Sequence, residues 1–180
     1  MDTQLANLTL REAYRLQDSE SKPYDIPWIV WLLENPDSPL PFPGQIYLRE
    51  HDYLHIIFGL DRSSESEAFL VGFAMGLDLN TRNIHLLILI LTSFFLYPKS
   101  YKFSMMDIRN LNRGFLVGRM PKFESLRVLN FELYLDQKVS DIRNAFGLQL
   151  PEPRSFISQT LNTMSNRLRS PFVFAHLKPP

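Results

Sequence analysis

Apolar residues recur every three or four positions along most of the chain, and alternation with a period of two is hardly sustained anywhere. A period near 3.6 residues is typical of α-helices that bury one face. The pattern therefore predicts an all-α protein, a single helical domain over residues 1–180 with about seven to nine helices. We expect these helices over residues 9–17, 25–35, 45–58, 65–76, 81–97, 105–117, 125–134, 140–146 and 155–168.

Prolines and a glycine indicate where helices are interrupted. The stretch PDSPLPFPG, residues 36–44, has four prolines, which fix φ and remove hydrogen-bond donors, so it predicts a stiff linker. Gly59 follows an apolar helical pattern and is expected to end that helix. Residues 151–180 are expected to be a C-terminal extension of the helical domain.

The longest apolar run is IHLLILILTSFFLY, Ile84–Tyr97. It has 14 residues, and a membrane-spanning helix needs about 20. We expect a helix that is buried on all sides. The alternative is a helix that also lines a lipid cavity or a subunit interface. Because the apolar surfaces of this helix and of the Phe-rich segments exceed what one small bundle can hide, we predict a homodimer.

Composition excludes several classes of function. Lys+Arg and Asp+Glu both number 19, and this zero net charge disfavours nucleic acid as a partner. The chain has no cysteine, so disulfides, thiolate metal sites and a cysteine nucleophile are excluded. The N-terminal residues lack the features of a signal peptide, so we expect a cytoplasmic protein, with peripheral attachment to a membrane as the alternative.

One stretch concentrates ligand-type side chains: LREHDYLHIIFGLDRSSESE, residues 48–67. On a helix, His51, Asp52 and His55 fall within one arc of the surface. If the next helix returns antiparallel, Glu67 lies level with His55. Imidazole nitrogens and carboxylate oxygens without sulfur predict a site for one divalent metal ion: zinc, magnesium, manganese or iron.

Simpler explanations of these residues stay open. Glu67 could close a capping box with Ser64, in which case it would not indicate a metal. The two histidines could form an ordinary surface pair beside balanced charges. The other two histidines, His85 and His176, stand alone among apolar residues and are not predicted to be ligands.

Three enzyme classes with similar motifs do not fit well. Zincins have H-E-x-x-H, whereas Asp52 follows the first histidine here and no third histidine is suitably spaced. HD phosphohydrolases need a further histidine upstream, and residues 1–50 contain none. Prenyl-transferring enzymes use paired aspartates, and this chain has no adjacent aspartates. An unrelated metal-dependent hydrolase remains an alternative.

The motif resembles that of the ubiquinone-biosynthesis family known as coenzyme Q protein four, H-D-x-x-H followed after eleven residues by Glu. His51, Asp52, His55 and Glu67 match this spacing at every position. A weaker similarity lies in FELYLDQKVSDIRNAFGL, residues 131–148. The likeness covers roughly residues 40–150, and only the metal motif is specific.

The resemblance implies a mainly helical protein that binds a divalent metal and a long isoprenoid lipid or prenylated aromatic, in ubiquinone-type biosynthesis. Two roles are associated with the family: a scaffold for other quinone-biosynthesis enzymes, and oxidative removal of the carboxyl group at ring C1 of a prenylated hydroxybenzoate. Catalytic residues, if any, would belong to the motif cluster. For the lipid tail we expect contacts from Phe58, Phe69 and Phe73, which lie on or beside the motif helices.

Overall fold

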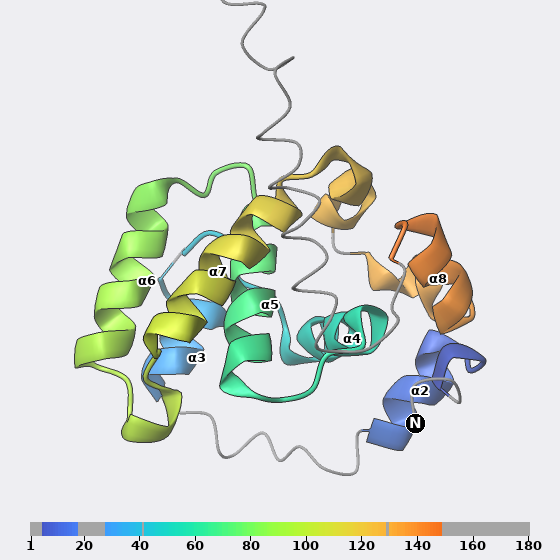
Figure 1. Cartoon of the computed structure of the whole chain (residues 1–180), viewed down its shortest axis with the longest axis horizontal. Helices are drawn as coiled ribbons and strands as arrows, with labels where there is room; N and C mark the ends of the chain where they lie inside the picture. The colour runs from blue at the N-terminus through green and yellow to red at the C-terminus, as the bar shows by residue number, and fades with distance from the viewer. Residues whose placement is uncertain (1–4, 18–27, 41, 129, 149–180) are drawn as a thin grey trace, which may run out of the picture.

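Apart from one isolated β-bridge between Thr9 and Lys138, the computed structural model is built of helices over the residues that it describes, 5–17, 28–40, 42–128 and 130–148. The predicted all-α fold is confirmed (Figure 1). The α-helices are α2 (Leu10–Gln17), α3 (Trp28–Glu34), α4 (Leu48–Phe58), α5 (Ser64–Leu77), α6 (Asn83–Phe95), α7 (Met105–Gly118) and α8 (Val139–Ala145). The 3-10 helices are η2 (Lys99–Tyr101), η3 (Pro121–Val128) and η4 (Phe131–Tyr134).

Helices α5 and α7 run side by side through the centre of the bundle, with α6 at one edge and α2 and α8 at the other (Figure 1). Their contact is built on glycines spaced four apart: Gly72 and Gly76 on α5, and Gly114 and Gly118 on α7. A Cβ atom on any of them would collide with a backbone carbonyl of the facing helix. The two backbones therefore touch, and there is no room for larger residues.

The core beside this pair is aromatic. Phe58, Phe69, Phe73 and Phe123 are fully buried. Phe58 and Phe73 meet edge to face with ring centroids 4.8 Å apart, and Phe73 meets Phe123 at 5.1 Å. This geometry suits the quadrupoles of aromatic rings. The cluster fixes the end of α4 against the middle of α5.

Two predicted helices differ from the observed elements. The helix expected over 45–58 begins only at Leu48. Gln45 lies before it, and its side chain donates hydrogen bonds to the carbonyls of Leu33, near the end of α3, and of Leu40, in the loop. The α-helix expected over 125–134 is instead two 3-10 helices, since Asn130 has a non-helical backbone with φ −85° and ψ 79°. The helix expected over 155–168 lies outside the described residues.

The expectation that the apolar run is buried on all sides is wrong within this chain. Helix α6 buries Leu86, Leu89 and Ser93. Its opposite side leaves seven large apolar side chains exposed, which we call the α6 face: Ile84, Leu87, Ile88, Leu91, Phe94, Phe95 and Leu96. An edge helix has core on one side only, so a sequence that is apolar all round must expose part of its surface. In the described part of the chain, no helix is both long and apolar enough to cross a membrane.

Candidate metal centre

The end of α4 is fixed by a glycine and an arginine. Gly59 is left-handed, with φ 60° and ψ 36°, a conformation that glycine adopts without steric cost. The turn lets the Leu60 N–H bond to the His55 carbonyl at 3.0 Å. From α8, the buried Arg143 guanidinium donates to the carbonyls of Ile56 and Ile57 at 2.8 and 3.0 Å. A cation is favourable at the negative end of a helix.

The loop between α4 and α5 is fixed by Asp61. Its carboxylate accepts hydrogen bonds from the hydroxyls of Ser63 and Ser66 at 2.6 and 2.7 Å. The N-cap of α5 is Ser63, whose hydroxyl accepts the Ser66 N–H. The side chain of Glu67 therefore takes no part in capping α5, and the capping-box explanation of this residue is wrong. Its carboxylate is left to point back toward α4.

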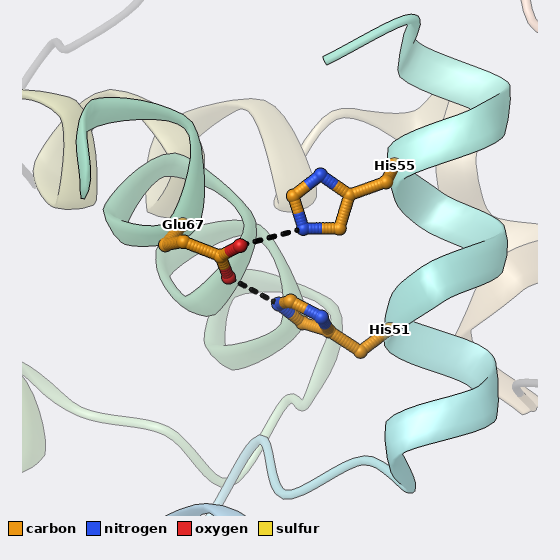
Figure 2. A group of neighbouring side chains, drawn as sticks. All are labelled: His51, His55 and Glu67. Carbon is orange, nitrogen blue, oxygen red and sulfur yellow. Dashed lines mark ion pairs between the residues drawn. The ribbon is translucent and has the colours of Figure 1, made fainter. Parts of the chain in front are cut away.

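Three of the four predicted ligands converge. His51 and His55 project from successive turns of α4, and Glu67 reaches both from the first turns of α5 (Figure 2). The Glu67 carboxylate is bridging: one oxygen lies 3.2 Å from Nε2 of His51, and the other lies 3.1 Å from Nε2 of His55. One ligand atom from each residue can be chosen so that all lie within 4.8 Å of one another. The arrangement is that of a two-histidine, one-carboxylate centre.

The hydrogen bonding of His55 favours a cation in this centre. Its Nδ1 lies 3.3 Å from the Leu60 carbonyl oxygen, which can only accept, so Nδ1 carries the hydrogen. In the neutral ring, Nε2 then carries no hydrogen, and its lone pair faces a carboxylate oxygen. This nitrogen is buried and has no hydrogen-bond partner. Two acceptors 3.1 Å apart need positive charge between them, from a proton or from a metal ion.

The same contacts are those that metal-binding histidines make. Such histidines usually donate their second ring N–H to a carbonyl or carboxylate, as His55 does to Leu60. Nitrogen and oxygen ligands about 2.0–2.2 Å from a zinc or magnesium ion lie roughly 2.9–3.4 Å from each other. The Glu67 oxygens lie 3.1 and 3.2 Å from the two imidazoles, within this range. The three residues offer nitrogen and oxygen ligands of the kind that bind a divalent ion, and these atom types do not select one metal.

The titration of the cluster follows from its contacts. Burial would lower the pKa of His51, but the hydrogen bond to Glu67 and the negative charges of Glu67, Glu34 and Asp52 together raise it. Burial would likewise raise the pKa of Glu67, yet the close contacts and the charges of His51 and His55 hold it well below its usual range. Each group therefore stabilises the charged form of the other, and an ion that replaces the protons must compete with that pairing.

Asp52, the fourth predicted ligand, lies outside the group that could hold an ion. Its buried carboxylate forms a salt bridge with Arg62 at 3.1 Å. Burial raises the pKa of Asp52, and the charges of Arg62, His51 and His55 oppose that shift. Asp52 thus ties α4 to the loop before α5 and adds negative charge near the histidines.

A cavity of about 680 Å³ opens beside the centre. His51, Arg62, Ser64 and Glu67 form a polar part of its wall. Most of the remaining wall is apolar or aromatic: Val30, Trp31, Ile46, Leu48, Val71, Ala74, Tyr97, Tyr101 and Phe103. A concave site of this size with few polar groups is typical of a small-molecule pocket.

The cavity also brings in two residues that sequence reasoning missed, Glu34 and Tyr97. The Tyr97 hydroxyl donates to a Glu34 carboxylate oxygen at 2.9 Å. Burial raises the pKa of Glu34 to about 7, against the hydrogen bond from Tyr97 and the charge of His51, which lower it. The only sequence signal was a carboxylate at the end of the apolar segment WIVWLLE.

The expected tail contacts are not found in this cavity. Phe58, Phe69 and Phe73 are fully buried, with 0% exposure each, and none of them lines the cavity wall. They pack on one another and on Phe123, because Phe58 at the end of α4 and Phe69 and Phe73 on α5 all face the core. Their assignment to a lipid tail is corrected to core packing.

His85 is not part of the centre. Its Nδ1 accepts the Arg82 backbone N–H at 3.0 Å, so it caps the start of α6. His176 lies outside the described residues.

The fold and this centre define a helical protein with a candidate divalent-metal site at the wall of a pocket. Comparison with protein-family models, curated proteins and solved structures gave no match for this chain.

Proposed function

We propose that the protein binds one divalent metal ion through His51, His55 and Glu67 and holds an isoprenoid or prenylated aromatic ligand in the adjoining cavity, as a component of ubiquinone-type biosynthesis. The observation that carries the proposal is the unpartnered, buried Nε2 of His55, which faces the Glu67 carboxylate while Nδ1 is committed to Leu60. The match of these residues to the H-D-x-x-H and Glu spacing supports the biosynthetic role.

The cavity supports an amphipathic ligand. His51 and Glu67 open onto it, while His55 is buried behind them, so an ion held by the three would be reached from the cavity. Arg62 adds a positive charge on the same wall, and its side chain is 42% exposed although paired with Asp52. An oxygen-bearing head group suits this polar wall, and the aromatic wall suits an apolar body.

The chemistry divides between ion and chain. A bound divalent ion would supply Lewis acidity toward a ligand oxygen. The side chains of this protein hold the ion, orient the imidazoles and enclose the apolar part of the ligand. Oxidative decarboxylation at ring C1 is the reaction that the motif resemblance suggests for such a ligand.

A lipid-binding scaffold without catalysis is the second candidate. The α6 face favours it, since exposed apolar side chains gathered on one helix are typical of an interaction site. A scaffold for other biosynthetic enzymes needs such a docking surface, whereas a self-contained enzyme does not. Both candidates share the metal centre and the ligand cavity.

Calorimetry with two ligands of equal tail length tests the proposal. Geranylgeranyl phosphate should bind about tenfold more tightly, or about 1.4 kcal/mol, when a divalent ion is present. The matching hydrocarbon should show no metal dependence, because only the head group senses the charge of the ion. His55→Ala should abolish the difference. Equal metal dependence of the two ligands, or none for either, would contradict the proposal.

A further inference from the structure

Glu34 and Tyr97 form a hydrogen-bonded pair on the wall of the same cavity as the metal centre. Glu34 ends α3, and Tyr97 follows α6, so two separate elements bring them together. Tyr97 is 3% exposed, and its hydroxyl donates to Glu34 at 2.9 Å. Tyr97 also contacts Phe103, with ring centroids 6.4 Å apart. These contacts fix the Glu34 carboxyl in place.

Glu34 lacks a cationic partner in the part of the chain that the structure describes. The ion pairs there involve other carboxylates, and Tyr97 provides the only hydrogen bond to Glu34. A carboxylate has about four acceptor sites on its two oxygens. Glu34 therefore keeps acceptor capacity while it lines a cavity, and a polar group left in this state is usually matched by water or by a ligand.

Charge decides which kind of donor Glu34 suits. A divalent ion at His51 and Glu67 would repel a cationic ligand group in the same cavity. A neutral donor, above all a hydroxyl, avoids this repulsion. The nearby Trp31, Tyr101 and Phe103 line the cavity and suit a flat, apolar ring.

We infer that Glu34, held in place by Tyr97, is a specificity-determining residue that accepts a hydrogen bond from a hydroxyl group on an aromatic ligand. The inference rests on the proposed function and deepens it, since it assigns the recognition of the ring hydroxyl to a residue outside the metal motif. Tyr97 is a positioning residue, because it acts on the ligand through Glu34.

Two probes that differ by one methyl group test this assignment on zinc-loaded protein. They are 4-hydroxy-3-prenylbenzoate and its 4-methoxy ether, which has no hydroxyl donor. Wild type should bind the phenol about tenfold more tightly than the ether, as a site built to bond a hydroxyl discriminates against its loss. Glu34→Met should reduce this ratio to about twofold or less, and Tyr97→Phe should lower it partly.

Controls separate this inference from the metal site. Glu65→Met removes an exposed carboxylate from the first turn of α5 and should keep the wild-type ratio. Glu34→Met should take up zinc like wild type, which also shows that it is folded. Should Glu34→Met fail to fold, Glu34→Gln replaces it, with a lowered ratio expected because one oxygen is lost.

The outcomes are distinguishable. A ratio in the Glu34 variant equal to that of wild type overturns the inference, as does equal affinity of wild type for both probes. If zinc binds but neither probe does, the inference fails and the metal site stands. If zinc itself does not bind, the proposed function fails first.

Discussion

Helix α5 has two sides that the protein uses in opposite ways. Toward α7 it presents Gly72 and Gly76, and the helix backbones meet with no side chain between them. Toward α4 it presents Glu67, a charged group that bridges two imidazoles next to a cavity. The first contact allows no adjustment, while the second leaves the buried His55 Nε2 without a hydrogen bond. A tightly held helix can thus carry a carboxylate at a fixed position for a ligand.

The glycine contact should give the largest effect on stability. Gly114→Val would drive its side chain into the Phe69 carbonyl of α5, which should cost about 3 kcal/mol or more in the free energy of unfolding, if the variant folds at all. Urea denaturation followed by circular dichroism measures this. Asn112→Ala, on the exposed side of the same helix, should change stability by less than about 0.5 kcal/mol. Similar stabilities for these two variants would contradict the close packing.

A smaller effect is expected from pH on the metal-free centre. The pKa of Glu67 is lowered from 4.5, so its contribution to stability is present above pH 4.5 and is lost as pH falls through the folded pKa. The pKa of His51 is raised from 6.5, so its contribution is present below pH 6.5 and is lost as pH rises through the folded pKa. The pair should therefore stabilise the metal-free protein most between these two values.

A bound metal ion should offset the loss of stability that the metal-free centre shows as the pH rises. An ion needs deprotonated imidazole, so added zinc should raise the melting temperature more at pH 8 than at pH 5.5. The measurement is thermal unfolding with and without zinc across this range, for wild type and for His51→Ala. His51→Ala should show little zinc dependence at either pH. An equal zinc effect at both pH values in wild type would contradict the account.

Substitutions on the α6 face should have the smallest effect on the stability of the fold. Their effect on dimer formation should be clear. The predicted homodimer would bury this face, so Leu91→Glu with Phe95→Glu should convert a dimer into a monomer. Since both side chains are exposed, the stability of the chain itself should change by only about 0.5 kcal/mol per site. Leu16→Glu, an exposed apolar position on α2, is the control. Light scattering that shows wild type as a monomer at micromolar concentration without detergent would refute the dimer.

Local spacing explains what the sequence could predict. His51, His55 and Glu67 lie within one helix–loop–helix segment, so helix geometry was enough to bring them together. Asp52 shares their arc, but only the structure shows that Arg62 takes its carboxylate. Periodicity likewise predicts that Phe58 lies on the buried side of a helix. It does not tell whether that side faces a core or a cavity.

Contacts between distant segments could not be predicted in this way. Glu34 and Tyr97 are 63 positions apart, and nothing local marks them as partners. The spacing of Gly72 with Gly76, and of Gly114 with Gly118, is visible in the sequence. Their meeting depends on α5 and α7 becoming neighbours, which only the packed bundle determines.

Metal titration of purified protein tests the central claim most directly. Calorimetry with zinc should show about one ion per chain for wild type, and His51→Ala and Glu67→Ala should each weaken binding by about a hundredfold or more, or about 2.7 kcal/mol. Glu65→Ala, which removes a neighbouring carboxylate that is exposed, should bind like wild type. Wild-type affinity in both His51→Ala and Glu67→Ala would contradict the metal centre.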